Sequence, residues 1–401
     1  MKVAFVIDVL LKAGGGNSAT YAEYKLARSI NEKNLEIEFI TTSKDTKKIL
    51  ENKFNDNISY YNKNSILDRF FLFLYQSDFF SFLIKRLKII NPFEKYLNRL
   101  GVDLLIFLAP SDLIFFLTKS NFVYTVWEFQ HKNYPFFPEY KNVFFDIDAR
   151  DKTLKLAADK SFKIIVGTKK SKEDFIKFYP CDPNKIIFRP LKPSIVDVNQ
   201  SSKDLDIIKK LKSKHINKFL FYPAQYWSHK NHKYIIDAFD KISNSANLNL
   251  ACVFAGSDKG NLKYINKLIK SKELTNKIHV FEFLSDEEIV DLYKNCFAVI
   301  VPTLVGTISF PILEGFYFKK PVLSGVDNLD DIFKDKVINL DLKNPDKLGD
   351  VLLFMEKNPE QIRNIVLNSK TYFDENYSDE KLTVKLLRII KEYQYYKQMW
   401  K

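Results

Sequence analysis

The chain has 401 residues, of which 46% are hydrophobic and 28% charged, and its formal net charge is +13. This length and composition exclude a disordered or fibrous chain and predict a globular protein of two or more domains. The excess of lysine favours an anionic partner, either nucleic acid, an anionic membrane surface or a phosphorylated substrate, or else reflects a lysine-rich solvated surface.

The cysteines and the apolar stretches bear on the cellular compartment. Cys181, Cys252 and Cys296 lie far apart without a Cys-x-x-Cys pair, so we expect small buried side chains and no disulfide framework. The first residues, "MKVAFVID", predict a strand and lack the pattern of a signal peptide. The longest apolar stretch, residues 70–84, is interrupted by Gln76, Ser77 and Asp78 and is too short to span a bilayer. We therefore expect a cytoplasmic protein.

Strands and helices alternate along the first half of the chain. Residues 18–34 read as a helix between two strands, and the later strands are near-continuous apolar runs, as in parallel sheets covered on both faces. These predicted strands occupy residues 2–10, 35–42, 102–109, 122–127 and 162–168.

The second half repeats the pattern. Helical segments such as residues 232–243 and 286–295 separate a new set of predicted strands. These strands occupy residues 218–225, 249–256, 277–284, 297–303 and 321–326. Two runs of βαβ units predict an α/β protein with two doubly wound Rossmann-like domains.

We place the domain boundary within residues 189–218, which hold two prolines, a polar stretch and a lysine run. The expected domains are residues 1–195, residues 196–377 and a tail of residues 378–401. The tail reads as one amphipathic helix that packs back on the first domain. Its apolar face would consist of Leu382, Leu386, Ile389, Ile390 and Tyr393.

Ligands of such sheets bind beyond the carboxyl ends of the strands, so the loops that follow strands are the candidate sites. In the first loop, Gly14, Gly15, Gly16 and Ala19 fit the dinucleotide spacing Gly-x-Gly-x-x-Ala. The second strand, however, ends without the acid that would bind an NAD ribose. We therefore expect Gly15 and Gly16 to let the backbone approach a phosphate or sugar, unless the loop is a flexible turn without a ligand.

A second loop, residues 125–140, places Glu128 and His131 among several aromatic residues. Aromatic faces stack on the apolar faces of sugars, while a carboxylate or imidazole binds their hydroxyls. We expect a sugar-binding role for both residues, although an isolated histidine is often structural.

A third loop, residues 222–232, carries Gln225 and Lys230 around a turn that suits a diphosphate. His229 and His232 in this loop have a metal-ligand spacing, but no third ligand lies nearby in the sequence. We expect no metal site there.

The fourth loop, residues 306–310, leads into a helix in which Pro311 suits the first position and Glu314 lies one turn in. Exposed amides and the helix dipole at such a helix start attract an anion such as a diphosphate. Glu314 would then reach the ribose hydroxyls beside it. Alternatively, Glu314 only complements the helix dipole, which is worth about 0.3–1 kcal/mol.

These segments together resemble the retaining glycosyltransferases of family 4 along nearly the whole chain. The clearest match is "VPTLVGTISFPILEGFYFKKPV", which is similar to the family segment Pro-Ser-x-x-Glu-Gly-Phe-Gly-x-Pro-x-x-Glu. Further matches are "FYPAQYWSHKN", "FEFLSDEEIVDLYKNCFAVIVPT" and "KIIVGTKKSKEDFIKFYPCDPNKIIFRP". The resemblance implies the GT-B fold, which has two facing Rossmann-like domains and a C-terminal helix that crosses back to the first. It also implies that residues 1–195 form the acceptor-side domain and residues 196–377 the donor-nucleotide domain.

The resemblance also implies roles for individual residues. Glu314 matches the second glutamate of the family's Glu-x7-Glu pair and would hold the donor ribose, while Lys230 would contact the diphosphate. The backbone of Phe283 and Leu284 would line the base pocket. The diphosphate and donor sugar would lie against Thr307, Ile308, Ser309 and Phe310.

Four positions depart from the family pattern. Its first motif glutamate falls on Gly306, its phosphate-binding arginine on Gln225, and its His-Asp pair on Trp127 and Glu128. The sequence "GTISFPILE" resembles a subgroup in which the first acid is replaced. Glu128 and His131 are then the candidates that contact the transferred sugar or the acceptor.

The implied reaction transfers a hexose from a nucleoside diphosphate sugar to a hydroxyl with retention of configuration. We expect no metal and no cofactor besides the donor substrate. The acceptor would be a glycan or a lipid-linked sugar of cell-surface polysaccharide or lipopolysaccharide synthesis. Basic residues around the aromatic segment 68–88 favour peripheral contact with the inner face of an anionic cell membrane, unless that segment is a core helix.

Two alternatives remain at the level of sequence. A sugar-nucleotide epimerase of similar build would need its own acid and base residues, and we find no convincing set. The other alternative is a binding scaffold that kept the fold but lost activity when it lost the glutamate at position 306. We expect no nucleic-acid partner, since no basic stripe or known module is present.

Overall fold

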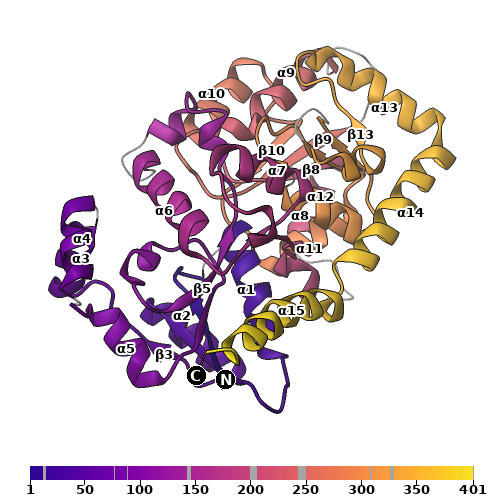
Figure 1. Cartoon of the computed structure of the whole chain (residues 1–401). Helices are drawn as coiled ribbons and strands as arrows, with labels where there is room; N and C mark the ends of the chain where they lie inside the picture. Colours follow the sequence, from indigo (N-terminus) through magenta and orange to yellow (C-terminus); the bar gives the residue numbers. More distant parts are fainter. Residues whose placement is uncertain are drawn as a thin grey trace. The chain divides into compact units, whose positions relative to one another are not determined.

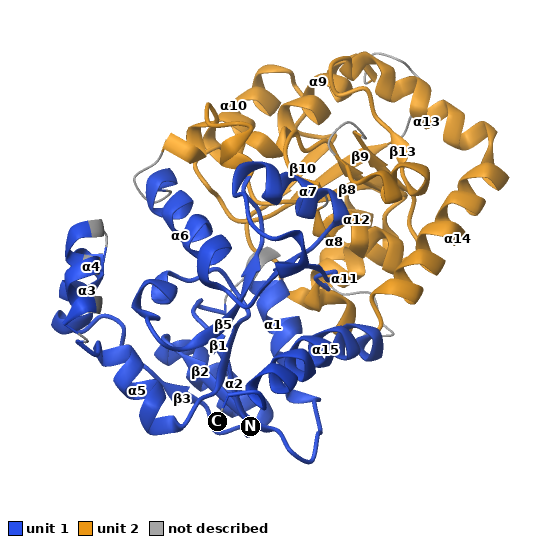
Figure 2. Cartoon of the chain, viewed as in Figure 1, with its two compact units in different colours: residues 1–129, 146–192, 379–401 blue, residues 130–145, 193–378 orange. Residues whose placement is uncertain are grey.

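The computed structural model describes residues 1–11, 15–75, 77–87, 89–141, 146–198, 206–242, 250–307, 309–325 and 329–400. The chain forms two compact units (Figure 2). Unit 1 comprises Met1–Phe129, Asp146–Lys192 and Asp379–Lys401, and unit 2 comprises Gln130–Phe145 and Pro193–Ser378.

Unit 1 contains a seven-stranded parallel sheet with the order β3-β2-β1-β4-β5-β6-β7. Its strands are β1 (Lys2–Ile7), β2 (Glu36–Thr41), β3 (Ser59–Tyr60), β4 (Leu104–Phe107), β5 (Asn121–Val126), β6 (Lys163–Val166) and β7 (Ile186–Phe188). The central strand β1 pairs with β2 on one side and β4 on the other, so that Val3 lies opposite both Ile37 and Leu104. Helices cover both faces of such a sheet, which explains the continuous apolar runs.

The helices of unit 1 surround this sheet (Figure 1). They are α1 (Gly15–Arg28), α2 (Lys44–Phe54), α3 (Ile66–Tyr75), α4 (Asp78–Arg86), α5 (Pro92–Leu100), α6 (Ile147–Lys160), α7 (Lys169–Phe178) and α15 (Asp379–Lys397), with the 3-10 turns η1 (Asp112–Phe116) and η4 (Pro183–Lys185). Sequence signals fix many of their ends. In α5, for example, the side chain of Asn91 accepts a hydrogen bond from the Glu94 amide, Pro92 opens the helix, and Gly101 ends it in a left-handed conformation.

The tail helix α15 packs within unit 1. The five apolar residues predicted for the tail are all buried, and Leu386, Ile389, Ile390 and Tyr393 join the core formed by β1, β2, β4 and α1. The Tyr393 hydroxyl donates to the Asp103 carbonyl and accepts from the Asn121 amide, each at 2.9 Å. Buried Arg189, which follows β7, links α1 to α15. Its guanidinium pairs with Glu23 on α1 at 2.6 Å and donates a hydrogen bond to the Leu382 carbonyl on α15.

Unit 2 contains a six-stranded parallel sheet with the order β10-β9-β8-β11-β12-β13. Its strands are β8 (Phe219–Pro223), β9 (Ala251–Ala255), β10 (Ile278–Phe281), β11 (Ala298–Val301), β12 (Val322–Ser324) and β13 (Ile338–Asn339). Its helices are α8 (Asp206–Ser213), α9 (His232–Ile242), α10 (Leu262–Ser271), α11 (Asp286–Asn295), α12 (Phe310–Tyr317), α13 (Leu348–Lys357) and α14 (Pro359–Asn376). Short 3-10 turns complete it: η2 (Gln130–Lys132), η3 (Pro138–Lys141), η5 (Ser194–Asp197), η6 (Ser228–Lys230), η7 (Asp331–Lys336) and η8 (Pro345–Lys347).

The fold class predicted from the sequence is therefore confirmed: the chain has two parallel Rossmann-like α/β sheets and C-terminal helices. One segment differs from the predicted boundaries, since residues 130–145 group with unit 2 although they follow β5 of unit 1. No helix in the described part of the chain is long and apolar enough to cross a membrane.

Candidate functional site

The centre of each sheet is a topological switch point. In unit 2 the chain moves outward from β8 to β9 and β10, then returns to the other side of β8 with β11, β12 and β13. The loops that follow β8 and β11 therefore leave neighbouring strands in opposite directions, and a crevice at the carboxyl end of such a sheet is the usual ligand site. Gln225, Lys230, Gly306, Thr307 and Ser309 lie in these two loops, and Phe310 is the first residue of α12.

Hydrogen bonds hold the β8 and β11 loops together. The His229 carbonyl accepts from the Leu304 amide at 3.0 Å and from the Thr303 hydroxyl at 3.4 Å. The Asn231 side chain donates to the Pro302 carbonyl at 3.2 Å. Asn231 has φ of +55°, which ends the η6 turn and lets α9 begin directly afterwards. The two loops thus form one connected surface at the end of the sheet.

A carboxylate from the segment 130–145 joins this surface. Glu139, on η3, accepts a hydrogen bond from the His229 amide at 3.1 Å and also contacts His229 Nδ1. Burial alone would raise the pKa of Glu139, but the hydrogen bonds from the His229 ring and amide outweigh it and hold this pKa below its usual value. The pair explains why this segment groups with unit 2.

Glu314 lies on α12, directly after the β11 loop. Its side chain is buried, 8% exposed, and accepts a hydrogen bond from the hydroxyl of Tyr293 on α11. Burial raises the pKa of Glu314 to about 7. The hydrogen bond from Tyr293 acts to lower this pKa, whereas the negative charge of Asp286 acts to raise it. A carboxyl that titrates near neutrality at the end of a sheet is typical of functional sites.

Close packing fixes the position of Glu314. A Cβ at the next residue, Gly315, would lie 2.4 Å from Val322 Cγ2 and 3.4 Å from Val299 Cγ2. Only a glycine lets α12 lie this close to strands β11 and β12. Glu314 is therefore held by the sheet itself rather than by a mobile loop.

The loop before α12 has two features of an anion site. Gly306 has φ of +112°, a conformation that residues with a side chain rarely adopt. The buried Ser309 hydroxyl, at the N-cap of α12, has no hydrogen-bond partner among the described residues. The Thr307 carbonyl accepts from the Asp330 amide at 3.0 Å, which anchors the loop on its other side. Ile308, also predicted to contact the donor, lies outside the described residues.

The β8 loop presents Gln225 and Lys230 differently. The Gln225 side chain donates to the Ser257 hydroxyl and accepts from the Trp227 indole, each at 3.1 Å, so both ends of its amide are occupied. Lys230 is half-buried, and its carbonyl accepts a hydrogen bond from the Tyr222 hydroxyl at 2.8 Å. Gln225 thus braces the loop, whereas the lysine is the cation that the loop supplies.

The other predicted donor contacts lie beyond β10. Phe283 is 80% exposed and Leu284 is half-buried, both just before the capping box of α11. An aromatic ring this exposed at the end of a strand can stack on a planar ligand.

The two loop histidines do not form a metal pair. His232 is fully buried against Tyr222, Tyr226 and Phe254, and burial lowers its pKa to about 3. His229 contacts Glu139 instead. Within the described residues, no group of three or more His, Cys, Asp or Glu side chains could hold a metal ion.

Glu128 and His131, each predicted to contact a sugar or the acceptor, belong to different units. Glu128 belongs to unit 1 and pairs with Arg150 on α6 at 2.6 Å. His131 belongs to unit 2, is 1% exposed, and packs edge-on against Tyr140 with ring centroids 6.3 Å apart. In unit 1, Gly15 and Gly16 begin helix α1.

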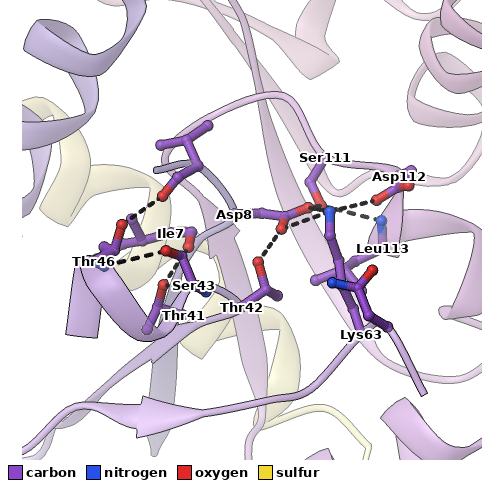
Figure 3. Close-up of polar contacts among 12 residues, drawn as sticks. Ile7, Asp8, Thr41, Thr42, Ser43, Thr46, Lys63, Ser111, Asp112 and Leu113 are labelled. Carbon is purple, nitrogen blue, oxygen red and sulfur yellow. Dashed lines mark hydrogen bonds and ion pairs between the residues drawn. The ribbon is translucent and has the colours of Figure 1, made fainter. Parts of the chain in front are cut away.

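Unit 1 has a polar cluster at its own switch point that the sequence reasoning missed (Figure 3). Asp8 follows β1 and is nearly buried. It pairs with Lys63 Nζ at 2.9 Å and accepts hydrogen bonds from the hydroxyls of Ser111, at 2.6 Å, and Thr42. Lys63 also lies 3.3 Å from Asp112. Burial would lower the pKa of Lys63, but Asp8 and Asp112 outweigh it and raise this pKa.

The members of this cluster follow four different strands, β1 to β4, at the same edge of the sheet. The only sequence signal available was that each comes shortly after an apolar run. Glu139 carried still less signal, because its partner His229 lies 90 residues away.

Comparison with known proteins relates this geometry to a family. The structure superposes on HepE of Anabaena, solved with UDP-glucose, with a TM-score of 0.72 and 13% identity over 98% of this chain and all of HepE. It superposes on a TarM variant of S. aureus, solved with UDP and alpha-GlcNAc-glycerol, with a TM-score of 0.67 and 11% identity over 97% of this chain and 99% of that one. It also superposes on WaaG, a glycosyltransferase involved in lipopolysaccharide biosynthesis, with a TM-score of 0.63 and 15% identity over 95% of this chain and 98% of WaaG.

The chain has the GT-B fold. Residues 204–372 also match the family described as Glycosyl transferases group 1. This match covers both loops of the unit 2 switch point, with Lys230 and Glu314. No curated protein matches the chain.

Proposed function

We propose that this GT-B chain is a retaining glycosyltransferase that moves a hexose from a nucleoside diphosphate sugar to a glycan or lipid-linked acceptor. The observation that carries the proposal is the fixed position of Glu314 beside the β8 and β11 loops, within the region that matches the family. The reaction would take place in the cytoplasm during synthesis of a cell-surface polysaccharide or lipopolysaccharide.

The donor diphosphate binds, in this proposal, at the start of α12. The Ser309 hydroxyl and the backbone of Thr307 and Phe310 face it there, and the positive end of the helix dipole favours its charge. Lys230 from the β8 loop supplies a positive charge that offsets the negative charge of the diphosphate. Gly306 leaves room beside the transferred sugar, because it has no side chain.

Glu314 holds the donor ribose in this proposal. Its second carboxylate oxygen accepts hydrogen bonds from the ribose hydroxyls while the Tyr293 hydroxyl holds the first. The backbone of Phe283 and Leu284 lines the base pocket, with the Phe283 ring against the base. Gln225 acts through the loop, since its amide is already bonded to Ser257 and Trp227.

The chemistry follows from charge. As the glycosidic bond to the diphosphate breaks, negative charge grows on the leaving phosphate, and Lys230 and the α12 amides stabilise it. The acceptor oxygen bonds to the anomeric carbon on the face that the phosphate leaves, which gives retention, and the leaving phosphate takes the proton of the acceptor hydroxyl. No protein base is needed for that proton, and we propose that no divalent metal takes part.

The acceptor binds to unit 1 in this proposal. The Asp8 and Lys63 cluster offers a carboxylate and an ammonium group at the end of the sheet, a combination that binds sugar hydroxyls. Glu128 and His131 remain candidates for contacts with the transferred sugar or the acceptor. Gly15 and Gly16, at the start of α1, allow close approach of the substrate to the backbone.

A panel of UDP-, GDP-, dTDP- and ADP-sugars tests the proposal through release of nucleoside diphosphate, with EDTA present. We expect release from one donor that increases with acceptor. The glycine at position 306 favours a second candidate, a scaffold that binds the nucleotide without turnover. Binding of a nucleotide without release from any donor would establish the scaffold and reject the enzyme.

A further inference from the structure

Helices α3 and α4 expose an unusual amount of apolar surface. Of the 24 large hydrophobic side chains that are exposed among the described residues, 11 lie between residues 66 and 90. We call these 11 residues the apolar patch. They are Ile66, Leu67, Phe70, Phe73, Phe79, Phe80, Phe82, Leu83, Leu87, Ile89 and Ile90. Scattered exposed apolar residues are ordinary, but such a concentration marks an interaction surface.

Eight residues of the patch belong to the folded helices α3 and α4, and Leu87, Ile89 and Ile90 follow directly after α4. On the inner side of α3, Phe71 and Leu72 pack against the unit 1 core, and Asp68 is buried and accepts hydrogen bonds from the Tyr61 and Ser65 hydroxyls. Tyr75, at the end of α3, meets Phe116 edge-on. Figure 1 shows α3 and α4 side by side at one margin of unit 1. The helices are therefore anchored by one face and present the other.

Among the described side chains, the exposed charges around the patch have one sign. Among the described side chains from residue 61 to residue 100, all exposed charged groups are basic: Arg69, Arg86, Lys95 and Arg99. The described acidic groups of this range, Asp68 and Glu94, are buried and engaged in hydrogen bonds. An apolar face bordered by basic side chains complements a bilayer that carries negative headgroups.

We propose that α3 and α4 dock the protein on the surface of an anionic lipid bilayer, with the apolar patch in the interface and Arg69 and Arg86 at the headgroups. A second copy of this chain is a poorer occupant, because each copy carries a net charge of +13 and the same basic border. This inference does not depend on the proposed function.

The test is sedimentation of the full chain with vesicles of pure phosphatidylcholine or with about 30% phosphatidylglycerol. We expect the protein to bind the anionic vesicles. Its affinity for neutral vesicles, and its affinity for anionic vesicles in high salt, should each be at least about tenfold lower. The fourfold variant Phe70→Ser, Phe73→Ser, Phe79→Ser, Phe82→Ser should lose binding. A matched control, Tyr264→Ser, Leu367→Ser, Tyr395→Ser, Met399→Ser, removes four exposed apolar side chains elsewhere and should bind as the wild type does.

A spectroscopic arm separates insertion from adhesion. Phe79→Trp should show a blue-shifted emission that brominated lipids quench, whereas Leu367→Trp should show neither. Absence of vesicle binding overturns the proposal, as does equal loss of binding in both fourfold variants. A wild-type dimer in sedimentation velocity that the patch variant alone dissociates, together with an unquenched Phe79→Trp, would show instead that the patch joins two copies.

Discussion

The raised pKa of Glu314 makes the stability of unit 2 depend on pH in a specific way. Its pKa rises from 4.5 to about 7 because its carboxyl is buried. The folded state therefore binds the proton more tightly than the unfolded state, and stability falls as pH rises from about 4.5 to about 7. Each pH unit of pKa shift is about 1.4 kcal/mol, so the full loss is about 3 kcal/mol.

Hydrogen exchange of the β8 and β11 amides measures this effect, because it reports opening of unit 2 by itself. Glu314→Gln cannot ionise and lacks this contribution. The free energy of opening of the wild type should therefore fall, relative to that of Glu314→Gln, by roughly 2.5 kcal/mol as the pH rises from about 5 to about 8. Glu139→Gln serves as a control of opposite sign, since the lowered pKa of Glu139 gives stability that is lost as pH falls. A Glu314 difference that stays constant with pH would refute the reasoning.

Three further substitutions test the packing of the site. Gly315→Ala should destabilise unit 2 by about 1–3 kcal/mol, measured by urea unfolding, because the new methyl group meets Val322; an unchanged midpoint would show that α12 can move. Gly306→Glu introduces the first glutamate of the family motif that the sequence resembles. It should lower the melting temperature and weaken donor binding, because φ at this position is +112°. A gain in turnover would contradict this expectation. Glu139→Gln should loosen the segment 130–145 from His229, seen as faster proteolysis of that segment, whereas unchanged cleavage would indicate that the pair does not anchor it.

The sequence was sufficient to predict five strands of each sheet, because these strands read as continuous apolar runs, whereas the short strands β3, β7 and β13 were not predicted. It also predicted the buried face of α15, since all five residues of that face share a helical spacing. In both cases the information is local.

The missed features depend on contacts between distant residues. Nothing around Glu139 indicates that His229 will lie beside it, and the four strand-end loops that place Asp8, Thr42, Lys63 and Ser111 together are spread over about a hundred residues. The 70–84 segment gave an apolar signal, but its division into α3 and α4, with one face left exposed, follows from how these helices pack on the core.

The central claim is that Glu314 holds the ribose of a nucleotide donor, and a binding cycle tests it most directly. Calorimetry would compare the nucleoside diphosphate selected by the donor panel with its 2′,3′-dideoxy analogue, for wild type and Glu314→Gln. We expect removal of the hydroxyls to weaken binding to the wild type by about tenfold or more and to have little effect on the variant, a coupling of about 1–3 kcal/mol. Equal loss of affinity in both proteins would contradict the role given to Glu314.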